Sequence, residues 1–289
     1  MSNNFFEVLR PGINTTFQDK GRFHMQHFGV TPGGCMDLKL FSIANALVGN
    51  SLNEGTLEFA YQGPLLKLIK GRTKIAITGN VLFQIIKSNE KVISGECNRT
   101  YILDQEDQID ILATKQSAYA YMAVEGGFNI KPFYKSVSVL SRAGIGPNEG
   151  KKIKISDKIN IKISSKSEKN HSTKIVNKNK NIIRVLKGPQ FNYLAKDSQK
   201  DFFSKEYKIS NLTDRMGMRL EGAVMQNVIN PNIRSEGITK GAIQVPADGQ
   251  PIVLLTDYPT IGGYPKIANV ISADYDILIQ KTPGEKIIF

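Results

Sequence analysis

A succession of short apolar runs between residues 56 and 124 constrains the fold more than any other feature of the sequence. Each run is long enough for a strand and too short for an ordinary globular helix, and turn residues separate most of them. The expected strands cover residues 56–60, 65–69, 74–78, 81–88, 91–93, 101–103, 108–112 and 118–124. This spacing predicts a mainly β protein, with antiparallel strands in a barrel or a sandwich.

Helices are expected to be few and short. Asp37 precedes a run with helical spacing over residues 38–48, and Gly49 follows it, so we expect a helix capped by Asp37 and ended by Gly49. A second short helix is expected over residues 197–205, with an Asp cap at its start.

A change in composition divides the chain. Residues 151–163 alternate Ile with polar residues, as in a half-buried strand, whereas residues 164–181 are rich in Lys, Asn and Ser. We therefore predict an N-terminal β-barrel-like domain over residues 1–163, a linker over 164–181 and a C-terminal β-barrel-like domain over 182–289.

The formal charge of +12 does not indicate a nucleic-acid-binding protein. Ten lysines and two acidic residues fall between residues 151 and 180, in a stretch without Arg or aromatic residues. Nucleic-acid surfaces usually combine Arg forks and stacking aromatics with the basic groups. We expect no nucleic-acid partner.

Other classes of protein are also disfavoured. The N-terminus has no secretory signal pattern, and no apolar stretch approaches membrane-spanning length, so a cytoplasmic protein without a membrane partner is expected. Cys35 and Cys97 are too few for a disulfide framework. His24, His27 and His171 do not have the spacing of a metal site, so no metal is expected.

Residues 243–272 form the most distinctive stretch of the C-terminal part. Two apolar runs, 252–255 and 267–271, enclose a loop rich in Gly and Pro, which predicts a hairpin with a long crown. In the crown, Gly262 and Gly263 can adopt positive φ angles and let backbone N–H groups approach a ligand, and Lys266 adds a charge.

Polar residues that suit a small anionic amide lie near this crown. Arg215 offers a planar fork for a carboxylate or phosphate, and Asp214 could orient it or act as a base. Gln244 and Gln250 carry amides that can bind both a carbonyl and an N–H group. A surface ion pair is the alternative explanation for Asp214 and Arg215.

Motifs from one end of the chain to the other resemble a known family. They are VLRPGINTTFQDKGR (8–22), HFGVTPGGCMD (27–37), ANALVGN (44–50), YMAVEGGF (121–128), SRAGIG (141–146), VLKGPQ (185–190), LTDRMGMRLEG (212–222), SEGITKGAIQVPADGQPIVLLTDYPTIGGYPKIA (235–268) and PGEKIIF (283–289). The sequence resembles biotin-dependent-carboxyltransferase-type proteins: the C subunits of 5-oxoprolinases, KipA-like regulators and the allophanate-hydrolase subunit 2 region of urea carboxylase.

The resemblance implies a fold and partners. It implies two tandem cyclophilin-like β-barrel units with a few short helices. It also implies a B-type, KipI-like partner and a third lactam-utilisation subunit, which together with this chain open 5-oxoproline to glutamate with ATP. ATP would act through the complex rather than through a motif of this chain. Biotin is not expected here, because no Ala-Met-Lys-Met-type attachment segment is present.

The resemblance also marks candidate site residues. The matched positions are Gln18, Asp19, Gly21, Arg22, Asp214, Arg215, Met216, Gly217, Ser235, Glu236, Gly237, Gln244, Pro246, Gln250, Pro251, Gly262, Gly263, Tyr264, Pro265 and Lys266. The family usually has Ser-Arg-Ser-Thr where this chain has Ser136-Val137-Ser138-Val139, so one arginine is absent. Met25 and Cys35 are further departures.

The leading hypothesis is the C subunit of an ATP-dependent 5-oxoprolinase, a hydrolase of carbon–nitrogen bonds. Arg215, oriented by Asp214, would hold a substrate carboxylate or phosphoryl oxygen, and Lys266 would stabilise oxyanion charge. Glu236 would activate water. The substrate-binding set would be Gln244, Gln250, Gly262, Gly263, Tyr264, Ser235, Gln18 and Arg22.

Two other functions use the same fold. One is a KipA-like regulator that binds and antagonises a histidine-kinase inhibitor. The other is a carboxyltransferase component that receives carboxybiotin from another chain. For the leading hypothesis, the sequence predicts a single pocket that contains both Arg215 and Lys266.

Overall fold

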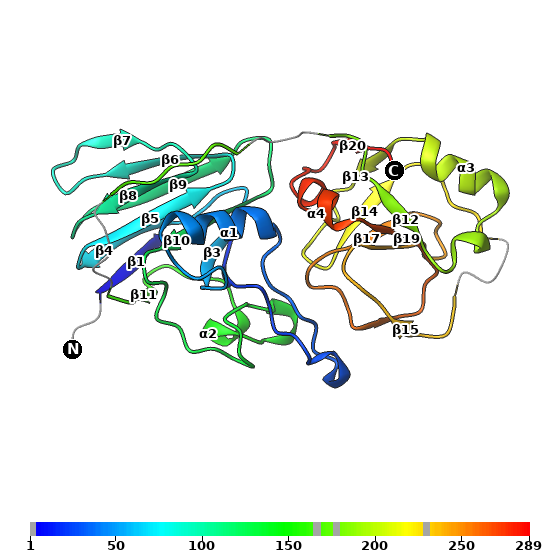
Figure 1. Cartoon of the computed structure of the whole chain (residues 1–289), viewed down its shortest axis with the longest axis horizontal. Coiled ribbons are helices and arrows are strands. Elements are labelled where there is room, and N and C mark those ends of the chain that lie inside the picture. The colour runs from blue at the N-terminus through cyan, green and yellow to red at the C-terminus, as the bar shows by residue number, and fades with distance from the viewer. Residues whose placement is uncertain (1–3, 164–168, 176–179, 228–231) are drawn as a thin grey trace. The chain divides into compact units, whose positions relative to one another are not determined.

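The computed structural model describes residues 4–163, 169–175, 180–227 and 232–289 (Figure 1). Its contacts separate two compact units, unit 1 with residues 1–22 and 37–176 and unit 2 with residues 23–36 and 177–289. The domain boundaries expected from composition stay a prediction. None of the described helices is long and apolar enough to cross a membrane.

Unit 1 consists of two antiparallel sheets, one of six strands in the order β11-β1-β4-β9-β6-β7 and one of five in the order β2-β3-β10-β5-β8. The strands are β1 (Asn4–Arg10), β2 (Asn14–Gln18), β3 (Thr56–Ala60), β4 (Leu65–Lys70), β5 (Thr73–Thr78), β6 (Val81–Ile86), β7 (Val92–Ser94), β8 (Arg99–Leu103), β9 (Gln108–Thr114), β10 (Tyr119–Val124) and β11 (Lys158–Ile161). Apolar side chains of both sheets form one buried core. The predicted short strands of this region are confirmed.

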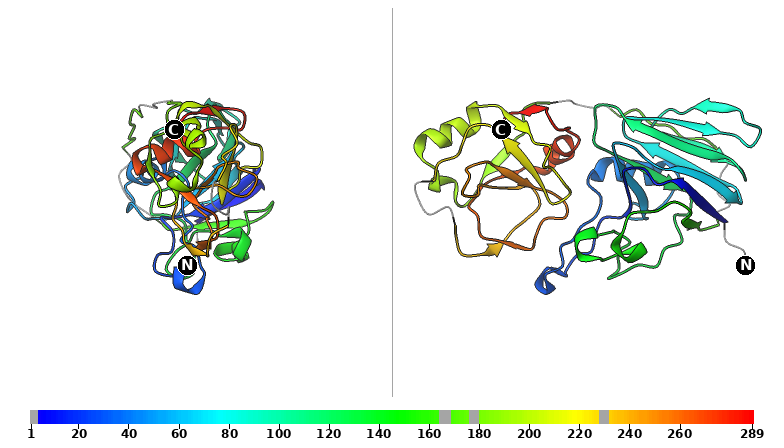
Figure 2. Two further views of the ribbon diagram at one scale, coloured as in Figure 1. Left: turned by 90° about the vertical axis from the view of Figure 1, so that its right-hand side faces the viewer. Right: turned by 180° about the vertical axis from the view of Figure 1, so that it is seen from behind.

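The helix α1 (Leu38–Leu47) of unit 1 begins as the sequence predicts. The Asp37 carboxylate accepts a hydrogen bond of 2.8 Å from the Leu40 N–H, which satisfies a free donor of the first turn. The Asp37 N–H donates to the Tyr121 hydroxyl, and Tyr121 donates to the Glu58 carboxylate. Strands β10 and β3 thereby fix the start of the helix, which packs against β10 and β5 and is seen against the sheet in Figure 1 and, from behind, in the right-hand view of Figure 2.

Part of the predicted linker is paired with unit 1. Residues 164–168 and 176–179 lie outside the described residues, so the prediction for them is not tested. Between them, Ser172 forms a bridge with Arg99 of β8, and the Thr100 N–H donates to the His171 carbonyl. Residues 151–163 form a shorter strand than expected, β11, and the remaining short elements are η2 (Ser141–Ala143) and α2 (Pro147–Gly150).

Unit 2 contains a seven-stranded antiparallel sheet in the order β12-β19-β16-β17-β14-β13-β20, together with the pair β15-β18. The strands are β12 (Val185–Lys187), β13 (Tyr207–Ile209), β14 (Gly217–Glu221), β15 (Glu236–Gly237), β16 (Ala242–Gln244), β17 (Ile252–Leu254), β18 (Ile261–Gly262), β19 (Lys266–Val270) and β20 (Lys286–Ile287). The helices are η1 (Gln26–Phe28), η3 (Phe191–Tyr193), α3 (Lys196–Ser204) and α4 (Ser272–Ile279). The mainly β architecture with two β units is confirmed.

The predicted hairpin of residues 243–272 is wrong. Strand β17 pairs with β14 and β16, and β19 pairs with β16 and β12, so β16 lies between the two runs. Gly262 instead pairs with Glu236, and neither Gly262 nor Gly263 has a positive φ angle. Two apolar runs around a loop do not specify which strand each run pairs with, since that depends on contacts distant in the sequence.

Helix α3 also begins differently from the prediction. Its N-cap is Ala195, which makes no side-chain capping hydrogen bond, and Asp197 lies within the first turn. An acidic residue there is favourable because it faces the positive end of the helix dipole. The expected helix is confirmed, but the expected Asp cap is not.

Candidate functional site

A lysine–glutamate pair occupies one end of the sheet in unit 2. Lys266 is the first residue of β19, and its ammonium lies 2.9 Å from the Glu236 carboxylate. The Lys266 side chain is 12% exposed and that of Glu236 is 45% exposed. The pair therefore joins a largely buried cation to a carboxylate that solvent or a ligand can reach.

Gln190 holds both members of this pair. Its side-chain oxygen accepts a hydrogen bond of 3.0 Å from the Lys266 N–H, and its amide nitrogen donates to the Glu236 carboxylate at 3.2 Å. Its own N–H donates to the Lys266 carbonyl. The sequence did not predict Gln190 as a site residue, although it ends the motif of residues 185–190. Only the tertiary pairing of β12 with β19 shows its role.

Gln244 and the two glycines complete this group. Gln244 is opposite Lys266 in the β16–β19 ladder and donates to the Tyr264 carbonyl at 3.4 Å. A side chain on Gly262 would place its Cβ 2.8 Å from the Gln244 amide nitrogen, and one on Gly263 would lie 3.5 Å from the Ser235 hydroxyl. Close approach, rather than positive φ, therefore explains Gly262, whereas the 3.5 Å at Gly263 is an ordinary van der Waals contact.

We name Gln190, Glu236, Gln244 and Lys266 the Lys266 cluster. It includes three of the residues that the sequence predicted, and the predicted Ser235, Gly262, Gly263 and Tyr264 surround it. Chemically, it offers one ammonium and one accessible carboxylate, beside two amides that are buried and hydrogen-bonded within the unit.

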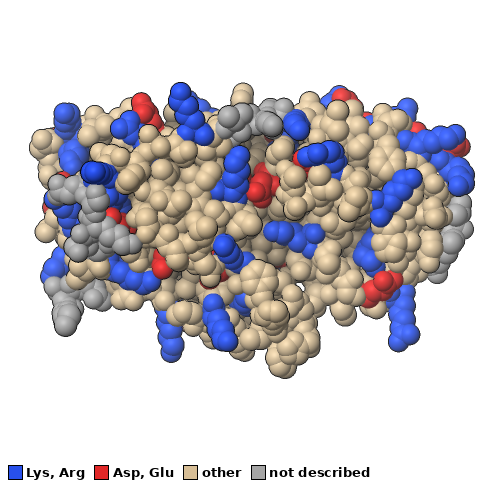
Figure 3. All heavy atoms as spheres, viewed as in Figure 1, with Lys and Arg blue, Asp and Glu red and all other residues tan. Residues whose placement is uncertain are grey.

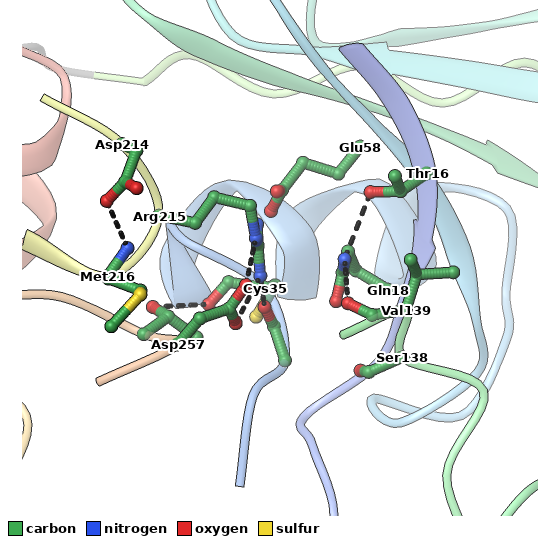
Figure 4. A network of polar contacts seen from close by, with 12 residues as sticks. Thr16, Gln18, Cys35, Glu58, Ser138, Val139, Asp214, Arg215, Met216 and Asp257 are labelled. Carbon is green, nitrogen blue, oxygen red and sulfur yellow. Dashed lines mark hydrogen bonds and ion pairs between the residues drawn. The ribbon is translucent and has the colours of Figure 1, made fainter. Parts of the chain in front are cut away.

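Arg215 has a different environment. Its guanidinium forms a bidentate pair with Asp257, at 2.8 and 3.1 Å (Figure 4). It also donates to the Gly34 carbonyl at 2.6 Å. The side chains of Arg215 and Asp257 are only 13% and 8% exposed. Because Gly34 belongs to the segment 23–36 of unit 2, this group ties that segment to the sheet.

Asp214 does not provide the orienting carboxylate expected for Arg215. It accepts hydrogen bonds from the N–H groups of Met216, at 2.8 Å, and Gly217, at 3.1 Å (Figure 4). This arrangement shapes the turn that leads into β14. Asp257, which lies 42 residues from Arg215, takes the predicted role of Asp214.

The ladder register separates Arg215 from Lys266. Lys266 pairs with Gln244, and Gln244 pairs with Ile252, so these three residues form one row across the sheet. Gly217 pairs with Leu254, two residues farther along β17. Arg215 lies two residues before Gly217, where its carbonyl accepts a hydrogen bond from the Asp257 N–H. The two side chains thus originate about four residue rows apart, or roughly 13 Å along the strands, and three strands apart across the sheet. The single pocket predicted to contain both is therefore a wrong expectation.

The other predicted residues have structural partners. The Gln250 amide binds both polar groups of the Gly222 backbone. In unit 1, Gln18 donates to the Thr16 hydroxyl at 3.0 Å and to the Val139 carbonyl at 3.1 Å (Figure 4). Arg22 donates to the Ser138 carbonyl. Their suggested part in substrate binding stays a prediction.

On the face shown in Figure 3, Lys and Arg side chains are scattered among uncharged ones. Among the described residues, no group of three or more His, Cys, Asp and Glu could hold a metal ion.

The sequence matches a family described as "Carboxyltransferase domain, subdomain A and B" over residues 28–289. The chain belongs to this carboxyltransferase-domain family. The match covers residues 37–176 of unit 1 and all of unit 2 except residues 23–27, and it includes every residue of the Lys266 cluster.

Relatives within the carboxyltransferase-domain family differ in length. The chain is 31% identical over 283 residues to the C subunit of 5-oxoprolinase from Escherichia coli, covering 98% of this chain and 90% of the relative. It is 28% identical to the urea amidolyase of Lachancea kluyveri, with 98% of this chain and 17% of that protein covered. The crystal structure of TTHA0988 superposes with a TM-score of 0.86 at 28% identity, over 99% of this chain and 56% of that one. The chain thus spans about half the length of that solved protein.

Proposed function

We propose that this chain is the C subunit of an ATP-dependent 5-oxoprolinase, which opens the lactam of 5-oxoproline to give glutamate. In this proposal it acts with a B-type, KipI-like partner and a third lactam-utilisation subunit in the cytoplasm. Similarity over 98% of the chain to a protein named as the C subunit of 5-oxoprolinase supports it.

The Lys266 cluster is the observation that carries the proposal. Opening a lactam places negative charge on the carbonyl oxygen while water attacks the carbonyl carbon. A fixed ammonium close to that oxygen lowers the barrier, and a carboxylate beside the water accepts its proton. Lys266 and Glu236 provide these two groups 2.9 Å apart.

The two glutamines provide order and recognition. Gln190 fixes the Glu236 carboxylate and the Lys266 backbone, so neither group needs to reorganise as charge develops. Gln244 lies beside Lys266 and can bind the substrate amide. ATP, bound by the assembled complex, would phosphorylate the carbonyl oxygen and so activate the carbonyl carbon toward water. After water adds, the C–N bond would break with the ring nitrogen leaving as a protonated amine, and hydrolysis of the resulting γ-glutamyl phosphate would give glutamate and phosphate.

Reconstitution tests this function. The chain, its B-type partner and the third protein are purified separately and combined, and ATP hydrolysis is measured with and without 5-oxoproline. We expect hydrolysis that depends on 5-oxoproline and requires all three proteins. If adding this chain gives no increase over the other two components, the proposal is wrong.

Carboxyl transfer is a second candidate, favoured by the family description and by the similarity to urea amidolyase. Here Lys266 would stabilise charge on the carboxyl group brought by biotin on another chain. Transfer of labelled carboxyl from free carboxybiotin to an amide acceptor would support it. The absence of 5-oxoproline-dependent ATP hydrolysis in the same preparation would favour it over the first function.

A further inference from the structure

Unit 1 contains a cavity of about 230 Å³ that has no part in the function proposed above. It is smaller than the roughly 300–1,000 Å³ typical of pockets for drug-sized ligands, so it suits a small metabolite. Its lining includes four apolar residues, Phe128, Ile130, Pro132 and Val137. Phe128 is buried in the core of unit 1, which gives this part of the lining a rigid base.

Glu54, which also lines the cavity, provides a carboxylate in a fixed position. Glu54 pairs with the Lys162 ammonium at 2.7 Å and remains one-quarter exposed. A Cβ on Gly127 would lie 2.3 Å from a Glu54 carboxylate oxygen, so the Glu54 side chain rests directly against the Gly127 backbone. The glycine thus allows Glu54 to take its place in the wall of the cavity.

Lys135 brings a second ammonium to the cavity. The Phe133 and Ser136 backbones exchange hydrogen bonds across a tight turn whose central residues, Tyr134 and Lys135, both have left-handed φ angles of 49° and 61°. Such conformations are costly for residues other than glycine and are found frequently at ligand sites. Among the contacts of the described residues, the Lys135 ammonium has no hydrogen-bond or ion-pair partner.

Asp19 also borders the cavity, but its carboxylate is already saturated. It accepts hydrogen bonds from the hydroxyls of Ser136 and Ser138 and from the N–H groups of Gly21 and Val137. Glu54 is therefore the carboxylate available to a ligand, and Lys135 and Lys162 are the two cations. The two carboxylates that line the cavity, Asp19 and Glu54, and the two ammonium groups of Lys135 and Lys162 give a formal charge of zero.

We propose that this cavity binds a free L-α-amino acid. A neutral but dipolar ligand matches an environment with no net charge and with charged groups of both signs. The ligand ammonium would bind Glu54, its carboxylate would bind Lys135 and Lys162, and its side chain would lie on Phe128, Ile130 and Pro132. These three contacts differ in chemistry, so the site distinguishes the L from the D form.

Calorimetry of the full chain tests this site without ATP or the partner proteins, so the result is independent of the reaction proposed above. The probes are L-leucine, L-valine, L-glutamine and D-leucine, together with isovalerate, which lacks the ammonium, and isoamylamine, which lacks the carboxylate. We expect saturable binding of at least one L-amino acid. D-Leucine and both fragments should bind at least about tenfold more weakly. Each fragment lacks one charged group and its hydrogen bond, and D-leucine cannot direct all three of its groups to their partners at once.

Variants locate the site. Lys135→Ala and Glu54→Gln should each weaken binding by about tenfold or more, whereas Lys131→Ala, an exposed lysine in the same loop that does not border the cavity, should not change it. Because Lys135 is exposed, its truncation leaves the fold intact and the test remains decisive even if Glu54→Gln does not fold. Three results would each overturn the proposal: no saturable binding at millimolar amino acid, isovalerate or isoamylamine binding as tightly as leucine, or unchanged binding by both variants.

Discussion

The Lys266 cluster and the Arg215–Asp257 pair lie at opposite ends of one sheet and contain similar chemical groups. In both, a basic side chain meets a carboxylate within hydrogen-bonding distance. At Lys266 the carboxylate is 45% exposed, whereas at Arg215 both partners are nearly buried. The first pair can exchange its partner for a ligand, but the second can do so only by leaving a charge buried and unpaired.

This difference assigns the two regions different tasks. The guanidinium of Arg215 holds the Gly34 carbonyl and so fixes the segment 23–36 to the sheet of unit 2. In the Lys266 cluster, the Gln190 amide holds the Glu236 carboxylate, which pairs with the Lys266 ammonium, and a preorganised catalytic site requires charges fixed in this way. We therefore expect changes at Arg215 to affect mainly stability and changes at Lys266 to affect mainly activity.

The largest expected effect is on stability, from Arg215→Met. The substitution leaves Asp257 buried without its cation, which should lower the free energy of unfolding by about 3–5 kcal/mol. Denaturant unfolding of the purified chain measures it. Arg219→Met is the matched control, since Arg219 is an exposed residue of the same strand β14 and should cost less than about 0.5 kcal/mol. If Arg215→Met is instead as stable as the unmodified chain but supports no 5-oxoproline-dependent ATP hydrolysis, Arg215 acts in catalysis rather than in stability.

Lys266→Met should reduce activity by about 10²- to 10³-fold, because it removes a fixed positive charge from the developing oxyanion. Its unfolding free energy should change little, since Glu236 remains accessible to water. The measurement is 5-oxoproline-dependent ATP hydrolysis by the reconstituted complex, alongside denaturant unfolding. Lys205→Met, at an exposed position, is the control. If Lys266→Met instead unfolds the chain and leaves the specific activity unchanged, the contrast between the two regions fails.

Gln190→Ala should reduce the same activity by about tenfold, through loss of the hydrogen bonds that orient Glu236 and Lys266. Gln250→Ala is the matched comparison for Gln190→Ala. The sequence placed Gln250 in the site, but its amide binds Gly222, so its removal should leave turnover unchanged. Equal losses of activity in the two variants would show that Gln190 has no special positioning role.

The sequence predicted local structure well and long-range pairing poorly. The Asp37 cap and the short strands of unit 1 depend on neighbouring residues, which a sequence displays directly. The contacts of Glu236 and Lys266 depend on strands β15 and β19, and the partner of Arg215 is 42 residues away. The resemblance to a family marked Glu236, Gln244 and Lys266, which the structure brings together, but it could not show that Arg215 and Lys266 belong to opposite ends of the sheet. Only the ladder register gives that separation.

The smallest expected effect concerns Asp214, which the sequence assigned to catalysis. Its carboxylate accepts two backbone hydrogen bonds in the turn before β14, so Asp214→Ala should cost about 1 kcal/mol of stability and little activity. Asp214→Asn should recover most of that stability, because its side-chain oxygen can still accept the N–H groups of Met216 and Gly217. Unfolding and activity assays on both variants measure this. A large loss of turnover in Asp214→Asn, with stability retained, would require a negative charge at this position and would assign chemistry to the Arg215 end of the sheet as well.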